Sequence, residues 1–167
     1  MSSARLLKNL VLSLVGIAGA SALAGAQTAT QTVTFAVNAI NQVSITGAPS
    51  LTITTAVAGS QPTSVTDASS IWAVTTNQTG AKVSANITTG GAMPAGLTLK
   101  VNLTTPGAPA VSNGQVTLGL AALDLVTGIT KTAVGSLSAT YQLDATAAAG
   151  VVTSSTRVVT YTLSGGT

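Results

Sequence analysis

The chain has 167 residues, of which 46% are hydrophobic and only 5% are charged, and its formal net charge is +3. It contains no His, Cys or Glu, so the usual general bases, thiol nucleophiles and soft metal ligands are missing. This composition argues against an enzyme and against a bound metal or cofactor. The few basic residues are scattered, which excludes the positive stripe that a nucleic-acid partner requires.

The first 26 residues have the pattern of an export signal. Arg5 and Lys8 precede an apolar stretch from Leu10 to about Ala20, and Ala24-Gly25-Ala26 is a small-x-small cleavage pattern. An uncleaved membrane anchor is the alternative, but the apolar part is short for a span of about 20 residues. We therefore expect removal of residues 1–26, a secreted or cell-surface protein that begins at Gln27, and no stable membrane insertion afterwards.

Residues 27–167 are expected to form a single domain of 141 residues. About a fifth of them are Thr, accompanied by many Val, and β-branched residues favour a pleated backbone. Four basic and three acidic residues leave this part with a net charge of +1. Without Cys, its stability must come from packing and hydrogen bonds.

The first alternating run is residues 31–39, in which Val33, Phe35, Val37 and Ala39 alternate with other residues. The pattern breaks at Ile40 to Gln42 and resumes with Val43 and Ile45, which predicts a bulge or a strand that changes sheets. No charged residue occurs from Gln27 to Thr66. Such a run can pair with a sheet edge of its own domain or of a neighbour's, which makes 31–39 a candidate exchanged N-terminal strand.

The remaining runs predict an all-β fold of about eight to ten short, mainly antiparallel strands, as in a sandwich or barrel. The segment from Ile71 to Val74 does not alternate, which predicts a strand covered on both faces or a register change. Two stretches, Gly119–Val126 and Asp144–Gly150, have a competing interpretation as helical turns. The alternating positions are Leu51 and Ile53; Val83, Ala85 and Ile87; Leu97, Leu99, Val101 and Leu103; Val116 and Leu118; Leu137, Ala139, Tyr141, Leu143 and Ala145; and Val159, Tyr161 and Leu163.

We predict that one buried core contains ten of these side chains: Leu97, Leu99, Val101, Leu103, Leu137, Tyr141, Leu143, Val159, Tyr161 and Leu163.

The export signal, the Thr-rich segment Thr30–Val37 and the final run Arg157–Leu163 resemble secreted bacterial immunoglobulin-like β-sandwich surface proteins, including fimbrial-subunit-like ones. The resemblance implies an immunoglobulin-like β-sandwich and a structural or adhesive role at the cell surface. Fimbrial subunits of the chaperone-dependent type often have a disulfide, and this chain departs from that pattern. Self-assembling surface fibres that exchange an N-terminal strand remain compatible with it.

The polar and aromatic residues suggest little chemistry. Asp124 and Asp144 could be read as a glycosidase-like pair, but each stands alone in the sequence, and Asp144 falls on the outward face of its strand. Asp67 also stands far from the other two aspartates in the sequence, so no calcium site is predicted. Trp72 is out of phase with Ile71 and is the one ring considered for a ligand, although a lone Trp in a sandwich belongs more often to the core. No catalytic or metal-binding residue is predicted.

Three functional hypotheses follow from the sequence. The first is a non-enzymatic extracellular subunit that assembles with copies of itself, or with other surface proteins, through the strand at Val33, Phe35, Val37 and Ala39. The second treats residues 31–39 as an ordinary first strand of a soluble secreted domain. The third is a ligand- or polysaccharide-binding module that uses Trp72 or the loops Gly90–Gly96 and Pro106–Asn113.

Overall fold

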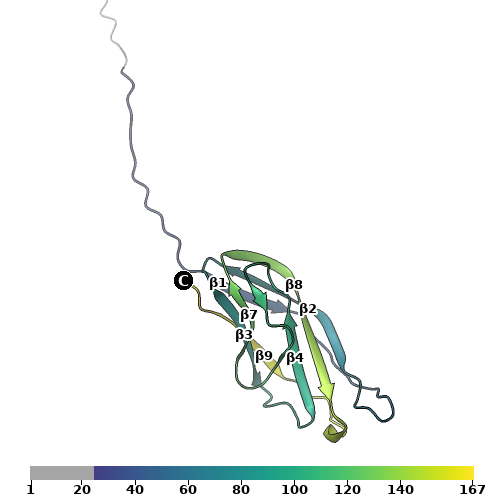
Figure 1. Ribbon diagram of the computed structural model, residues 1–167. Helices are drawn as coiled ribbons and strands as arrows, with labels where there is room; N and C mark the ends of the chain where they lie inside the picture. The colour runs from purple at the N-terminus through teal and green to yellow at the C-terminus, as the bar shows by residue number, and fades with distance from the viewer. Residues whose placement is uncertain (1–24) are drawn as a thin grey trace, which may run out of the picture. The chain divides into compact units, whose positions relative to one another are not determined.

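The computed structural model describes residues 25–167, which form an all-β structure in two antiparallel sheets (Figure 1). The predicted signal peptide lies almost wholly outside the described residues. The described part contains nine strands and one short 3-10 turn, η1 (Ala147–Ala149). The strands are β1 (Asn41–Thr46), β2 (Val65–Thr76), β3 (Ala81–Thr89), β4 (Leu97–Leu103), β5 (Val111–Ser112), β6 (Val116–Thr117), β7 (Leu123–Ile129), β8 (Thr132–Ala145) and β9 (Val158–Ser164).

The two sheets have five and four strands. The first has the order β1-β2-β8-β4-β6 and the second β5-β7-β3-β9, with every neighbouring pair antiparallel. Their inward residues share one core, so the arrangement is consistent with a β-sandwich. The predicted all-β class and the approximate number of strands are confirmed for the described residues. The strands are not uniformly short, because β2 has 12 residues and β8 has 14.

The alternation of apolar residues along the strands explains which side chains form the core. Val83, Ala85 and Ile87 of β3 are at most 2% exposed, and Val101 and Leu103 of β4 are completely buried. Strand β7 adds Leu125, Val126 and Ile129, although Gly119–Val126 had a competing helical interpretation. The second stretch with a competing helical interpretation, Asp144–Gly150, contains a 3-10 turn at Ala147–Ala149.

Part of the predicted core is less buried than expected. Val101, Leu103 and Tyr141 are buried, whereas the other seven predicted core side chains are only half-buried. Leu51 and Ile53 are also half-buried but lie in no strand. The predicted irregularity at Ile71 to Val74 is a register shift between Trp72 and Val74, and Ile71 is exposed, so the strand is not covered on both faces.

Residues 25–36 and 37–167 are separate units of the chain. Every residue from 25 to 36 is exposed, and none belongs to a strand. The run 31–39 is therefore not a strand in the isolated chain, and its role as an exchanged strand stays a prediction. Between residues 25 and 167, no helix has the length and apolar character needed to cross a membrane.

Candidate assembly site

The alternating N-terminal run presents its apolar side chains to solvent. Val33 is 71% exposed, Phe35 88% and Val37 79%, and Ala39 is exposed as well. In an extended backbone, side chains two residues apart lie on the same face, so these three large residues would form one apolar stripe. An exposed apolar stripe of this kind is a candidate interaction surface.

The chain becomes fixed where this run joins the compact part. The Ile40 backbone N–H donates to Asn77 Oδ1 over 2.8 Å, and Asn77 Nδ2 donates to the Asn38 carbonyl oxygen over 2.8 Å. The Asn77 backbone N–H also donates to the Ile40 carbonyl oxygen, over 3.2 Å. One Asn side chain at the end of β2 thus holds residues 38–40, and β1 starts directly after them.

A groove opens between the two sheets at the other end of β1. It has a volume of about 460 Å³, and its walls come from the last residues of β1 and from the start of β9, whose strands lie side by side. Apolar side chains make up much of the lining: Ile45, Leu51, Met93, Leu99, Leu143 and Val159. A second hollow of about 620 Å³ shares Leu51, Met93 and Leu143 with it.

The groove exists because β1 covers only half of β2. Strand β1 ends at Thr46, opposite Ile71, so residues Val65 to Ser70 of β2 have no strand on that side. Gly47 follows with φ +122°, a conformation that favours glycine, and Pro49 lacks the N–H that a strand ladder needs. The chain therefore leaves the sheet at this point.

Burial of β4 and β8 decreases toward the groove. In β4, Val101 and Leu103 are completely buried, but Leu97 and Leu99 are half-buried. In β8, Ala139 is completely buried, and Leu143 farther along the strand is half-buried. The inner face of this sheet is thus less covered at the groove than at Val101, Leu103 and Ala139.

Two tyrosines join the sheets inside the groove. Tyr141 of β8 and Tyr161 of β9 both line it, and their hydroxyl oxygens are 2.6 Å apart. Burial raises the pKa of both hydroxyls, and in Tyr161 the neighbouring Tyr141 raises it further. Both groups therefore stay protonated at neutral pH, and the bridge carries no charge.

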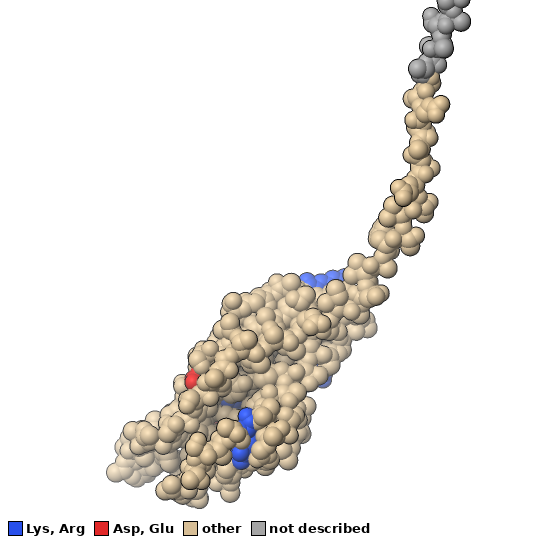
Figure 2. Space-filling model, turned by 180° about the vertical axis from the view of Figure 1, so that it is seen from behind, with Lys and Arg blue, Asp and Glu red and all other residues tan. Residues whose placement is uncertain are grey.

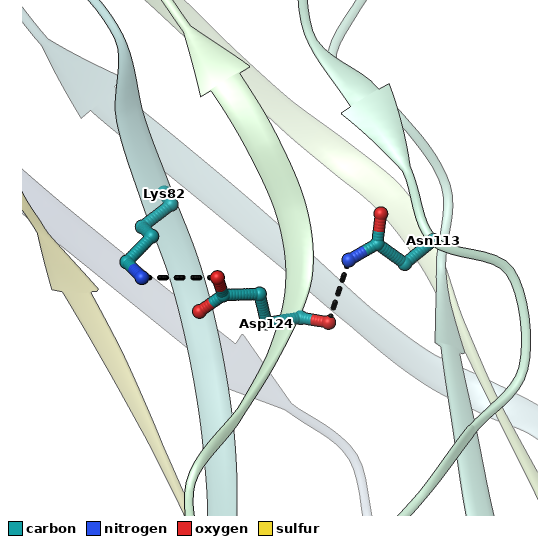
Figure 3. Close-up of polar contacts among 3 residues, drawn as sticks. All are labelled: Lys82, Asn113 and Asp124. Atoms are coloured by element: carbon teal, nitrogen blue, oxygen red, sulfur yellow. Dashed lines mark hydrogen bonds and ion pairs between the residues drawn. The ribbon is translucent and has the colours of Figure 1, made fainter.

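The two carboxylates considered as a glycosidase-like pair are not brought together. Asp144 of β8 forms an ion pair with Lys100 over 2.7 Å, and its pKa is lowered to about 2 by the hydrogen bonds from Lys100, Ser64 and Gln142. Asp124 lies on β7 in the other sheet and forms an ion pair with Lys82 over 2.9 Å (Figure 3).

Further hydrogen bonds of Asp124 and Asp67 connect neighbouring segments of the fold. Asn113 Nδ2 donates to the Asp124 carbonyl oxygen over 2.8 Å (Figure 3). Asp67 accepts backbone N–H bonds from Ser50 and Ser69, and hydrogen bonds to Ser69 and Ser50 lower its pKa. Within residues 25–167, no group of three or more metal-ligating side chains exists.

The aromatic ligand candidate, Trp72, is part of the core. Its side chain is only 2% exposed, and its indole N–H has no hydrogen-bond partner among the described residues. A ring in this position offers no face to a ligand. Among the aromatic residues of the described chain, only Phe35 is highly exposed.

Charge is sparse on the surface, as Figure 2 shows for one face, where blue and red atoms occupy only small patches. Arg157 borders the groove, but its guanidinium is engaged: Nη2 donates to the Ala92 carbonyl oxygen over 3.0 Å and Nη1 to that of Thr156 over 2.9 Å. This cation also ties β9 to the Gly90–Gly96 loop, one of the loops considered for ligands. The groove lining thus combines apolar side chains with Ser, Thr and Tyr, and its charged residue, Arg157, is hydrogen-bonded.

The sequence predicts the apolar stripe but not the groove. The alternating pattern of residues 31–39 is enough to identify the stripe. The groove joins Leu51, Met93, Tyr141 and Val159 from four separate segments, and no local pattern links them. Comparison with known proteins adds no identity: no protein-family model, no curated protein and no solved structure matches the chain.

Proposed function

We propose that this protein is a non-enzymatic extracellular structural subunit that assembles with copies of itself into a cell-surface fibre or layer by β-strand addition. In this mode, an extended segment of one molecule adds a strand to the sheet edge of another. The export part of the proposal rests on the sequence of residues 1–26, and the immunoglobulin-like character of the sandwich rests on the resemblance in layout.

The observation that carries the proposal is the exposed apolar stripe at Val33, Phe35 and Val37. Burial of a large apolar side chain stabilises by about 1.5–3 kcal/mol relative to leaving it in water. Three such residues on an unpaired segment therefore provide a strong drive to pair. Main-chain hydrogen bonds supply the rest, because an extended backbone leaves its N–H and C=O groups available.

The low charge of the chain supports the same function. Soluble monomers commonly protect strand edges with charged residues, especially Lys, or with Pro. Residues 27–66 contain no charge, and β1 and β9 are both edge strands. An uncharged edge and an uncharged apolar segment permit association.

A pair of matched variants tests this function. Phe35→Asp places a carboxylate on the apolar stripe, whereas Thr34→Asp places the same charge one residue away on the opposite face of the strand. We expect the purified mature protein to form fibres or layers in electron microscopy, Phe35→Asp to sediment as a monomer, and Thr34→Asp to assemble. The reason is that burying an unpaired carboxylate costs several kcal/mol, while the solvent face tolerates it.

The proposal fails if the unmodified mature protein remains monomeric at high concentration. It also fails if both aspartate variants weaken assembly equally, because charge alone, and not the apolar stripe, would then control association.

A further inference from the structure

We infer that the groove between β1 and β9 is the acceptor for residues 33–37 of a second copy of this chain, and that the subunits consequently join head to tail. This inference rests on the proposed function and adds the surface that receives the strand. It concerns the compact part of one molecule and the N-terminal segment of another.

The lengths of the edge strands select the acceptor. The outermost strands of the two sheets are β1, β6, β5 and β9, and residues Val65 to Ser70 of β2 are also unpaired on their β1 side, beyond the end of β1. Strands β5 and β6 have two residues each, too few for a ladder with a five-residue segment. Strands β1 and β9 have six and seven residues, and they lie side by side at the groove.

The segment that leads into β9 forms the more continuous wall. Five consecutive residues, Ser155 to Val159, line the groove together with Tyr161, and of these five only Val158 and Val159 belong to β9. Strand β9 is bonded to β3 on one side only, and its inward residues Val159, Tyr161 and Leu163 are half-buried. A strand added beside Ser155 to Val159, beyond the end of β1, would extend the four-stranded sheet at the groove and cover Val159.

The stripe suits the groove in shape and charge. Five extended residues span about 16 Å, and their alternation would place Val33, Phe35 and Val37 inward while Thr34 and Ala36 face solvent. The groove presents half-buried Ile45, Leu99 and Val159. The Arg157 guanidinium at the border already donates to the Ala92 and Thr156 carbonyl oxygens, so a strand that enters the groove need not supply these hydrogen bonds.

The position of the two surfaces sets the polarity of assembly. Asn77 holds residues 38–40 at the start of β1, the same end at which Thr167 exchanges backbone hydrogen bonds with Thr79. Figure 1 shows the C-terminus next to the start of β1. The groove is lined by Thr46, Gly47 and Val158, at the opposite ends of β1 and β9.

Each subunit therefore carries its donor attachment at one end and its acceptor at the other. The two surfaces differ, so the contact is heterologous and repeats without closing. An open chain of subunits is the expected product.

Disulfide trapping tests this arrangement, because the natural chain has no Cys and engineered pairs react without competition. The test variant of the mature protein combines Val37→Cys with Val159→Cys, and the control combines Val37→Cys with Val111→Cys on the distant edge strand β5. All three changes replace Val by a residue of similar size. A second test variant uses Val158→Cys, which lies at the groove and is half exposed, in case Val159→Cys disturbs folding.

After mild oxidation, we expect the test variants to give a ladder of covalent oligomers in non-reducing electrophoresis and the control to give only single chains. A band that stops at two chains would overturn the head-to-tail polarity. An internal disulfide within single chains would overturn exchange between copies.

The experiment distinguishes a wrong choice of acceptor from a wrong proposed function. If fibres form but the control cross-links and the test variants do not, the acceptor lies elsewhere and strand addition survives. If no variant cross-links and the natural protein does not assemble, both the groove assignment and the proposed function fail.

Discussion

The two halves of β4 differ in burial although they share one sequence pattern. Val101 and Leu103 are completely buried, whereas Leu97 and Leu99 in the same strand, with the same alternation, remain half-buried. The cause lies outside the strand: the first pair faces a part of the domain that both sheets close, and Leu99 faces the groove. Alternation identifies the inward face of a strand, but the neighbouring elements decide how much of that face is covered.

We expect the largest difference in stability when a leucine in each half of β4 is replaced by alanine. Leu103→Ala should cost about 2–5 kcal/mol of unfolding free energy, because it removes buried contacts and leaves a cavity. Leu99→Ala should cost less than about 2 kcal/mol, since its side chain is already partly in water. Urea denaturation in the Phe35→Asp background, where we expect a monomer, measures both. Equal costs would show that the groove is closed in solution.

A smaller effect is expected at the groove rim, where Gly47 passes close to β2. A Cβ at this position would lie 2.8 Å from Ser70 Cα, in addition to the unfavourable positive φ. Gly59 also has a positive φ, but a Cβ there would meet nothing within 4 Å. We expect Gly47→Ala to cost about 2–4 kcal/mol and Gly59→Ala about 1 kcal/mol. Thermal melting of the two variants compares them, and similar losses would mean that the rim can move.

The smallest effect concerns the ion pair of Lys100 and Asp144 on the outward face of these strands. The pKa of Asp144 is lowered from 3.8 to about 2 in the folded protein, so the stabilisation is complete above about pH 5 and is lost as the pH falls through about 2. The pair is partly exposed, which limits the effect to about 1 kcal/mol. Urea denaturation between pH 5 and pH 2 should show this loss.

Asp144→Asn should remove this part of the pH dependence, because the amide has no titrating proton. Asp124→Asn, which breaks the ion pair with Lys82 on the other sheet, should leave it in place. Retention of the full slope in Asp144→Asn would assign it to another group.

The strands with strict alternation were predictable from the sequence. The run at Leu97–Leu103 became β4, and the runs around Val83 and Val159 became β3 and β9. Strand β7 was harder to recognise, because Ala, Leu and Gly in and before it weaken the strand signal. Leu51 and Ile53 alternate in burial but have no ladder partner, which a period-2 pattern cannot reveal.

The candidate site was predictable only in its local part. Residues 31–39 carry their apolar stripe in consecutive sequence, so the pattern alone identified the proposed donor. The proposed acceptor depends on where β1 ends and on where β9 begins beside it, and both follow from tertiary packing.

The burial of Trp72 has a spectroscopic consequence. It is the chain's single tryptophan, so excitation of indole reports one position only. Its ring is shielded from water and its N–H makes no hydrogen bond among the described residues, an environment that shifts indole emission to short wavelength. Trp72 lies opposite Ile45, a groove residue, in the β1–β2 ladder. The natural protein thus contains an optical probe beside the groove, and its emission would report occupation of the proposed acceptor surface without any added label.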